Sequence, residues 1–391
     1  MLTFNYDNES GKDTNLNSIE EAMRDFDKFI KSSYMSGWIN IDNSYINLCN
    51  EINEFVDELK KENRYMIVIG IGGSYLGAAS AIELISKENN VFFIGPYLDK
   101  DYLEKIIHIC KTENVVIDVI SKSGNTMETR LFFDILKPIL KDKYGKKYIN
   151  HITCTTGNTG ELYKEAIKNN YKIFNIPDNI GGRYSVFTAA GLLPMAFAGI
   201  DIKSLIHGVL EFNNQQEAFQ YAIIRNNYFK NNKNIEIFIG YEKKFELFNE
   251  WLKQLFGESE GKNNKGIFPA SVIFPKDLHS LGQYIQEGKK QIFETAIYVK
   301  NREKSNNLYV DNDKIDNLLE AIIKGPILAH RDGGTPVNEI IVDKLDAYNL
   351  GQLYYFFGLS CAISAHIMGV DPFNQPGVER YKSKIREILS K

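Results

Sequence analysis

The sequence has few of the residues that build disulfide frameworks and zinc sites. Its 391 residues include four cysteines and six histidines, and it contains neither a CxxC nor an HExxH pattern. The cysteines are widely separated, at Cys49, Cys110, Cys154 and Cys361. These features argue against a disulfide-stapled scaffold and against a zinc site built from neighbouring residues. We expect the cysteines to be ordinary core or surface residues.

Long apolar runs and an excess of positive charge are also lacking. The longest apolar stretch, residues 189–200, is broken by Pro194 and is too short to cross a bilayer. The N-terminus lacks the basic start and the apolar centre of a signal peptide. A net charge of −4 provides no basic surface for nucleic acid. We therefore expect a soluble, cytoplasmic protein that binds neither membrane nor nucleic acid.

What the sequence does contain is a regular alternation of apolar runs and helical patterns. With 43% apolar residues over its length, the chain can fill two hydrophobic cores. Amphipathic stretches such as 100–110 and 127–140 separate the runs of a first set. That set predicts strands at 64–71, 91–96, 115–121, 148–156 and 171–177. The rhythm predicts an α/β protein with a five-stranded parallel sheet covered on both faces by helices.

A second set of apolar runs begins after Gly199. It predicts strands at 235–241, 271–275, 293–299 and 327–331. Because helical patterns again separate these runs, we expect a second, similar α/β unit.

The segment 115–129, VVIDVISKSGNTMET, carries the strongest functional signal. An apolar strand ends in hydroxyl-bearing residues and a glycine, and a helix-forming stretch follows. Hydroxyls and backbone N–H groups at such a helix start favour a phosphate dianion. The nucleotide pattern GxxxxGK[ST] is absent, because its nearest match, GESEGK at 257–262, is one residue short and precedes Asn263. The loop therefore indicates a compact phosphomonoester, such as a sugar phosphate, more than a nucleoside triphosphate.

A second glycine-rich turn, GIGGSYLG at 70–77, also follows a strand and opens a helix. Its glycines allow a ligand to approach the backbone closely. Tyr75 occupies the place of the third glycine in GxGxxG, and the next strand ends without an acidic residue for a ribose. Alone, such a turn is typical of a plain strand-to-helix connection. Two such turns at the carboxyl ends of neighbouring strands predict a ligand site.

Four further polar residues each have both a functional and an ordinary interpretation. Arg183 follows paired glycines in DNIGGRYS, where a guanidinium could stabilise an oxyanion or simply pair with a carboxylate. Glu258, just past the helix expected at 245–256, is either a general base or a solvated acid in a helix-ending turn. His279 is either a catalytic residue or an ordinary residue at a helix start. For Lys382 the ordinary interpretation is a solvent-exposed lysine on a terminal helix.

Taken together, these motifs resemble the phosphoglucose isomerase family, which is built from two sugar-isomerase domains. The resemblance runs from about residue 64 to residue 382 and rests on five separated motifs in the right order, among them DNIGGRYS, GESEGK and PFNQPGVERYK. It implies two doubly wound αβα sandwich subdomains of the sugar-isomerase type with parallel sheets, flanked by helical segments. The implied boundaries are an N-terminal helical segment at 1–63, a first domain with the phosphate loop at 64–199, a second domain at 200–345, and a C-terminal helical segment carrying Lys382 at 346–391.

The resemblance also implies an activity, the reversible isomerisation of glucose 6-phosphate and fructose 6-phosphate in glycolysis and gluconeogenesis. The reaction would pass through ring opening and a cis-enediol intermediate. Glu258 would be the base that moves a proton between C1 and C2, and Arg183 would stabilise the enediolate. His279 and Lys382 would assist opening of the sugar ring. The matching positions imply that substrate is bound by Ser74, Ser121, Lys122, Ser123, Thr126, Glu128, Gln254 and Gln375.

Cofactor and partner expectations follow from the same resemblance. No metal or organic cofactor is required, because Arg183 and Lys382 supply positive charge near the developing oxyanion. In the family the histidine reaches the active site from the partner subunit, so the resemblance implies a homodimer in which His279 serves the partner's site. The sequence departs from the family at Asn125, where threonine is usual. We expect this change to alter phosphate affinity more than chemistry.

Three alternatives stay open from the sequence. A sugar-phosphate-binding regulator would use the loop without needing Glu258, His279 and the two cations, and its added DNA-binding segment is not found. A dehydrogenase would need the dinucleotide fingerprint that residues 70–77 lack. An isomerase of relaxed specificity that also accepts mannose 6-phosphate would differ by as little as one pocket residue.

Overall fold

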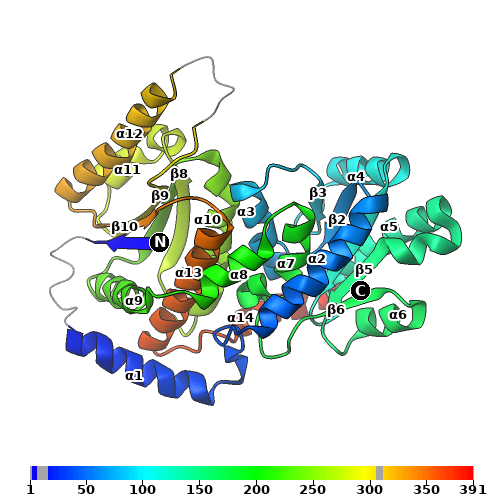
Figure 1. The fold of residues 1–391 in the computed structure, drawn as a ribbon. Helices are drawn as coiled ribbons and strands as arrows, with labels where there is room; N and C mark the ends of the chain where they lie inside the picture. The colour runs from blue at the N-terminus through cyan, green and yellow to red at the C-terminus, as the bar shows by residue number, and fades with distance from the viewer. Residues whose placement is uncertain (1, 7–15, 305–310, 391) are drawn as a thin grey trace. The chain divides into compact units, whose positions relative to one another are not determined.

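The computed structural model describes residues 2–6, 16–304 and 311–390, which form two compact units (Figure 1). The first-sheet unit contains residues 34–211 and 346–351, and the second-sheet unit contains the remaining described residues. Each unit is built on a five-stranded sheet. Within the described residues, none of the helices combines the length and the apolar character needed to span a membrane.

The first sheet has the strand order β3-β2-β4-β5-β6, and all of its neighbouring strands are parallel. Its central strand is buried along its whole length, which explains why β-branched residues make up most of its sequence, VVIDVIS. All five strands match the positions predicted from the sequence, so the predicted parallel sheet is confirmed. The strands are β2 (Tyr65–Ile69), β3 (Val91–Ile94), β4 (Val115–Ser121), β5 (Ile152–Thr156) and β6 (Lys172–Asn175).

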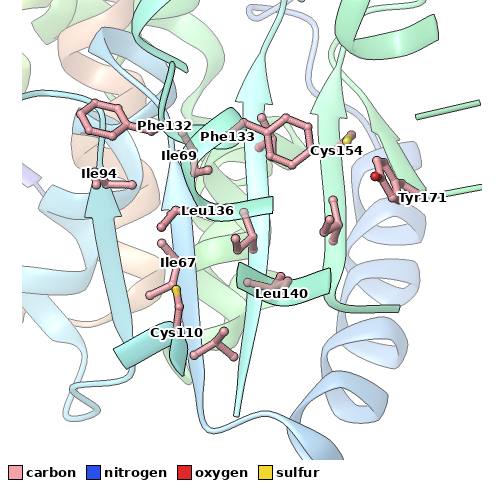
Figure 2. Packing of buried hydrophobic residues seen from close by; sticks show 14 of the residues in the cluster. Ile67, Ile69, Ile94, Cys110, Phe132, Phe133, Leu136, Leu140, Cys154 and Tyr171 are labelled. Carbon is pink, nitrogen blue, oxygen red and sulfur yellow. The ribbon is translucent and has the colours of Figure 1, made fainter. Parts of the chain in front are cut away.

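Helices cover both faces of the first sheet. On one face, apolar residues of three helices pack against alternate strand residues, as Phe133 does near Cys154 (Figure 2). These helices are α4 (Lys100–Thr112), α5 (Met127–Tyr144) and α6 (Glu161–Asn169). On the other side, α7 contacts β2 and packs against three further helices. This group comprises α2 (Ser44–Glu62), α3 (Leu76–Ile85), α7 (Ala189–Phe197) and α8 (Ile202–Leu210).

The second sheet has the strand order β1-β10-β9-β7-β8. Its strands are β1 (Leu2–Asn5), β7 (Ile235–Gly240), β8 (Phe268–Ile273), β9 (Ile292–Val299) and β10 (Val337–Val342). Four of them are parallel, and β1 pairs antiparallel to β10 at the edge. The strands predicted at 235–241, 271–275 and 293–299 are confirmed as β7, β8 and β9.

Helices also cover both faces of the second sheet. One core, between the sheet and α11 (Gly282–Glu287) and α12 (Asn312–Asp332), includes Ile239 and Ile327. The opposite core includes Phe293 and lies under α9 (Gln215–Lys230) and α13 (Ala347–Ile367). The remaining helices are α1 (Leu16–Ser32), which contacts α9, α10 (Glu246–Glu260), which packs on β7 and β8, and α14 (Pro376–Leu389).

Two sequence-based expectations for this sheet are wrong. The strand expected at 327–331 lies inside α12, where Ile323, Ile327 and His330 are buried at helical spacing. The short apolar run is therefore the inner face of an amphipathic helix, and the fourth parallel strand is β10. Residues 2–5, expected within a helical segment, form β1 and make the sheet mixed.

Candidate active site

In the first-sheet unit, the predicted phosphate loop joins β4 to α5. Gly124 adopts a φ of +70°, which disfavours a side chain, and its N–H donates to the carbonyl oxygen of Ser121 at 3.1 Å. Asn125 Oδ1 accepts a 3.3 Å hydrogen bond from the N–H of Glu161 at the start of α6. The loop is therefore a tight turn at the carboxyl end of the central strand, the position where open α/β sheets bind ligands.

Two hydroxyls of the loop contact each other. Ser121 Oγ and Thr126 Oγ1 are 3.0 Å apart, and the Thr126 side chain makes no capping hydrogen bond to α5. The dipole of this helix favours an anion at its first turn. Ser121 is buried, Ser123 is exposed, and Thr126 and Glu128 are half-buried. A cavity of about 10 Å³ behind the two hydroxyls, also lined by Thr129, has room for one water molecule and not for a sugar.

Lys122 ties the phosphate loop to the arginine turn, which we define as residues 178–183. Its Nζ donates to the carbonyl oxygens of Asp178 and Ile180, each at 2.8 Å. Burial lowers the pKa of the Lys122 ammonium, and the charge of Asp178 opposes this shift. The ammonium therefore holds the backbone of the arginine turn and adds positive charge beside the loop.

The arginine turn packs directly on the glycine-rich turn. A Cβ at Gly73 would lie 2.0 Å from the carbonyl oxygen of Gly182, so this close approach requires glycine. Ser74, next in the chain, is half-buried, and Arg183 is only 2% exposed. The first-sheet unit therefore brings together the glycine-rich turn at 70–77, the phosphate loop and Arg183.

In the second-sheet unit, Gln254 and Glu258 lie one turn apart on α10. Nε2 of Gln254 donates a 3.1 Å hydrogen bond to Oε1 of Glu258, and both side chains are half-buried. Oε1 of Gln254 is buried and has no hydrogen-bond partner among the described residues. Buried acceptors are normally satisfied, and a ligand hydroxyl or water can satisfy this one. A half-buried carboxylate oriented by an amide suits a general base.

The helix carrying Glu258 is longer than expected. The sequence predicts that Glu258 follows the helix in a turn, whereas α10 continues to Glu260 and contains Glu258 in its last turn. Ser259 and Glu260 are fully buried, and this burial holds the last turn against the unit's core. The expected helix end is therefore wrong.

Two lysines fasten the segment after Glu258 to the chain that leads into PFNQPGVERYK. Nζ of Lys262 donates to the carbonyl oxygen of Asp371, and Nζ of Lys265 donates to that of Met368 at 2.8 Å. The two motifs are therefore anchored to each other within the second-sheet unit.

The other predicted residues of this unit, His279, Gln375 and Lys382, are exposed. His279 ends a short 3-10 turn, and its side chain makes no hydrogen bond with any described residue. Gln375 precedes α14, and Lys382 lies on that helix with its Nζ 3.5 Å from Oε1 of Glu379. An exposed pair of this kind contributes little to stability, so Lys382 is not fixed strongly by it.

The sequence analysis missed a buried charge cluster beneath α10. It consists of Arg225 on α9, Glu236 on β7 and Glu260 at the end of α10, all fully buried. The available signal was Glu236, a carboxylate inside the apolar strand IEIFIG. Such a residue needs a buried cation, and sequence alone does not indicate which arginine supplies it.

Comparison with known proteins identifies what this chain is similar to. The family model described as phosphoglucose isomerase matches residues 41–269. The glucose-6-phosphate isomerase of Acetivibrio thermocellus is 38% identical over 418 residues, which cover 95% of this chain and 93% of that protein. The glucose-6-phosphate isomerase of Caldanaerobacter subterraneus is 41% identical over 389 residues, which cover 91% of this chain and 86% of that protein.

Solved structures share the fold. A hypothetical protein from Thermus thermophilus matches over 100% of both chains with a TM-score of 0.89 and 23% identity. A glucose-6-phosphate isomerase from Chlamydia trachomatis matches 88% of this chain and 72% of its own, with a TM-score of 0.75 and 20% identity.

Proposed function

This chain belongs to the phosphoglucose isomerase family, and we propose that it interconverts glucose 6-phosphate and fructose 6-phosphate by aldose–ketose isomerisation. The geometric observation that supports this most is the hydrogen bond from Gln254 to Glu258, which orients a half-buried carboxylate. Relatives named glucose-6-phosphate isomerase that match more than 90% of the chain support the same reaction.

The reaction needs two proton-transfer stages. Ring opening adds a proton to the ring oxygen and removes one from the hydroxyl at C1. A base then takes a proton from the carbon beside the carbonyl, which leaves an enediolate, and returns it to the adjacent carbon, while the proton of the neighbouring hydroxyl moves to the former carbonyl oxygen. A single carboxylate can perform both transfers at carbon, which is the role we propose for Glu258.

Other proposed roles follow the chemistry of each side chain. Arg183 stabilises the negative oxygen of the enediolate, and His279 and Lys382 assist ring opening. The phosphate is held at the loop between β4 and α5, where the hydroxyl pair and the start of the helix support anion binding. The proposed phosphate ligands are Ser121, Lys122, Ser123 and Thr126, with Ser74 lining the same pocket. Glu128, Gln254 and Gln375 are proposed to contact the remaining substrate.

We further propose that the active form is a cytoplasmic homodimer in which His279 serves the partner's site. The exposure of His279 and the lack of a hydrogen bond from its side chain to any described residue support this role. Mixing Glu258→Gln and His279→Ala chains tests it, because a mixed dimer then contains one intact site. Recovery of about a quarter to a half of the wild-type activity is expected. Verified mixed dimers without recovery would contradict the shared site.

The direct test of the reaction follows the formation of glucose 6-phosphate from fructose 6-phosphate in the presence of a chelator. A separate assay with mannose 6-phosphate in place of fructose 6-phosphate tests the specificity. Glu258→Gln should lower turnover roughly a hundred- to ten-thousand-fold. Glu250→Gln, an exposed carboxylate on the same helix, is the control and should keep wild-type turnover. A folded wild-type protein that binds phosphate without turnover would instead be a sugar-phosphate-binding protein.

A further inference from the structure

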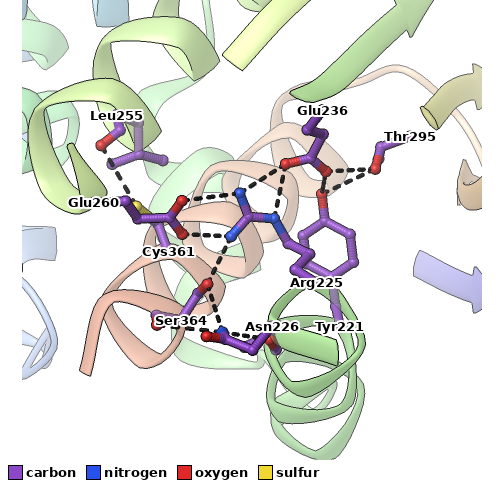
Figure 3. Close-up of polar contacts among 10 residues, drawn as sticks. Tyr221, Arg225, Asn226, Glu236, Leu255, Glu260, Thr295, Cys361 and Ser364 are labelled. Atoms are coloured by element: carbon purple, nitrogen blue, oxygen red, sulfur yellow. Dashed lines mark hydrogen bonds and ion pairs between the residues drawn. The ribbon is translucent and has the colours of Figure 1, made fainter. Parts of the chain in front are cut away.

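The guanidinium of Arg225 is completely engaged inside the second-sheet unit (Figure 3). Nε and Nη2 both contact Oε2 of Glu236 at 2.7 Å, and Nη1 and Nη2 donate to the two carboxylate oxygens of Glu260. Nη1 also donates to Oγ of Ser364 at 2.7 Å. These contacts use all five N–H donors of the side chain, so its orientation is fixed.

The cluster holds two carboxylates with one guanidinium. Glu236 receives further hydrogen bonds at Oε1, from the hydroxyl of Tyr221 at 2.6 Å and from that of Thr295 at 2.7 Å. Glu260, by contrast, has Arg225 as its charged partner. The two carboxylates keep the pKa of the Arg225 guanidinium well above its usual value. The pair with Glu260 is therefore an ion pair that is buried from solvent.

Glu260 connects this contact to the proposed base. It is the last residue of α10 and lies two positions after Glu258. The Arg225 guanidinium also lies 4.1 Å from the ring centroid of Phe256, one turn before Glu260. Arg225 thus holds the final turn of α10 from the side of the core, through an ion pair and a cation–π contact. Helix ends otherwise fray easily.

We propose that Arg225 and Glu260 are positioning residues that hold the last turn of α10, so that Glu258 is kept in the geometry needed for proton transfer. This inference rests on the proposed function, because it assigns Glu258 as the base. Neither residue touches substrate in this proposal. Small displacements of a catalytic group, of about 1 Å, lower rates roughly a hundredfold, so a loosened helix end should affect turnover strongly.

The test compares variants of two buried carboxylates, both in the second-sheet unit. Glu260→Gln removes the charge that Arg225 binds at the helix end. Glu294→Gln removes an equally buried carboxylate on β9, which pairs with His330 at 2.8 Å and, among the described residues, makes no side-chain hydrogen bond or ion pair with Arg225, Glu236 or Glu260. Both variants change a buried carboxylate into an amide, and thermal unfolding measures how much stability each change costs. They differ in whether the lost carboxylate lies on α10.

The expected results separate positioning from general destabilisation. At a temperature where both variants are folded by circular dichroism, Glu260→Gln should lower kcat at least about tenfold with KM changed less than about threefold. Amide hydrogen exchange in residues 254–260 should become at least about tenfold faster in this variant. Glu294→Gln should keep kcat within about twofold and leave exchange in that segment unchanged.

Three outcomes would overturn the proposal or its premise. Wild-type kcat in Glu260→Gln would overturn it, and so would an equal loss of kcat in Glu294→Gln. An inactive wild-type protein would remove the proposed function, but the exchange comparison would still decide whether Arg225 and Glu260 hold the helix end. If Glu260→Gln does not fold, the triple variant R225M/E236Q/E260L leaves no uncompensated charge in the cluster and is measured in the same way.

Discussion

Gln254 and Glu258 are joined by a 3.1 Å hydrogen bond across one turn of α10, with the amide as donor and the carboxylate as acceptor. The amide's own carbonyl oxygen is buried without a partner among the described residues. One side chain therefore both orients the proposed base and carries a buried acceptor that can take a further hydrogen bond.

Replacing Gln254 with methionine should lower kcat about tenfold, because Glu258 loses the donor that orients it. The side-chain volume is nearly kept, so the melting temperature should change little. The control is Gln283→Met, which breaks the equivalent Gln283–Glu287 hydrogen bond of 2.7 Å on the exposed face of α11. Equal kcat values for the two variants would show that the Gln254–Glu258 bond does not orient the base.

Replacing Thr126 with valine should weaken the binding of inorganic phosphate about tenfold. The change removes a hydroxyl that pairs with Ser121 at the start of α5, and a hydrogen bond to an anion is worth about 1.5–3 kcal/mol. Isothermal titration calorimetry measures the affinity. Thr112→Val, an exposed position in the same unit, should leave it unchanged. An unaltered affinity in Thr126→Val would argue against the loop as the phosphate site.

Replacing Lys122 with methionine should affect both binding and turnover. The two carbonyl oxygens of the arginine turn lose their donor, and the loop loses a positive charge. We expect phosphate affinity and kcat each to fall about tenfold, since the turn also holds Arg183. Steady-state kinetics and phosphate titration separate the two effects, with Lys111→Met on the surface of α4 as control. A loss of phosphate affinity with unchanged kcat would mean that Lys122 only binds phosphate and does not position Arg183.

The burial of Asp118 should make the free energy of unfolding depend on pH. This residue is fully buried in β4, and burial raises its pKa to about 7, well above the ordinary 3.8, although a hydrogen bond from Thr155 opposes the shift. The folded chain therefore binds this proton more strongly than the unfolded chain does. Its contribution to stability is full below about pH 4 and is lost as the pH rises to about 7.

The measurement is the free energy of unfolding in urea at several pH values for wild type and Asp118→Asn. The difference, variant minus wild type, should grow by a few kcal/mol between pH 4 and pH 7 and then level off. Asp142→Asn, at an exposed position on α5, should follow the wild type at every pH. A constant difference across the range would mean that Asp118 keeps the same charge in both states.

The sequence predicted the first sheet well because each of its strands is a separate apolar run between turns or helices. It failed at one end of the second sheet, where β1 and β10 are neighbours. The strand β10 mixes polar and apolar residues, and β1 has only four residues, so neither forms a long apolar run. The apolar run at 327–331 belongs to a helix because residues far apart in the sequence, such as Ile239, pack against it.

The parts of the candidate site that lie in consecutive residues could be predicted from the sequence. The contacts between residues far apart in the sequence could not. The phosphate loop is confirmed as a strand–turn–helix connection between β4 and α5, because its signal lies in consecutive residues. The roles of the site residues stay predictions. The carbonyl partners of Lys122 and the pairing of Arg225 with Glu260 depend on tertiary packing across long sequence separations. No pattern in the sequence specifies those partners.

The antiparallel strand β1 has a consequence for handling this protein. It pairs with β10 through residues 2–5 and so occupies one outer edge of the second sheet. Without β1, the backbone N–H and C=O groups of β10 on that side would be open to pairing with another chain. Trimming residues 2–5, or fusing a bulky tag that displaces them, should therefore promote self-association at high concentration, even though these residues lie far in sequence from every proposed site residue.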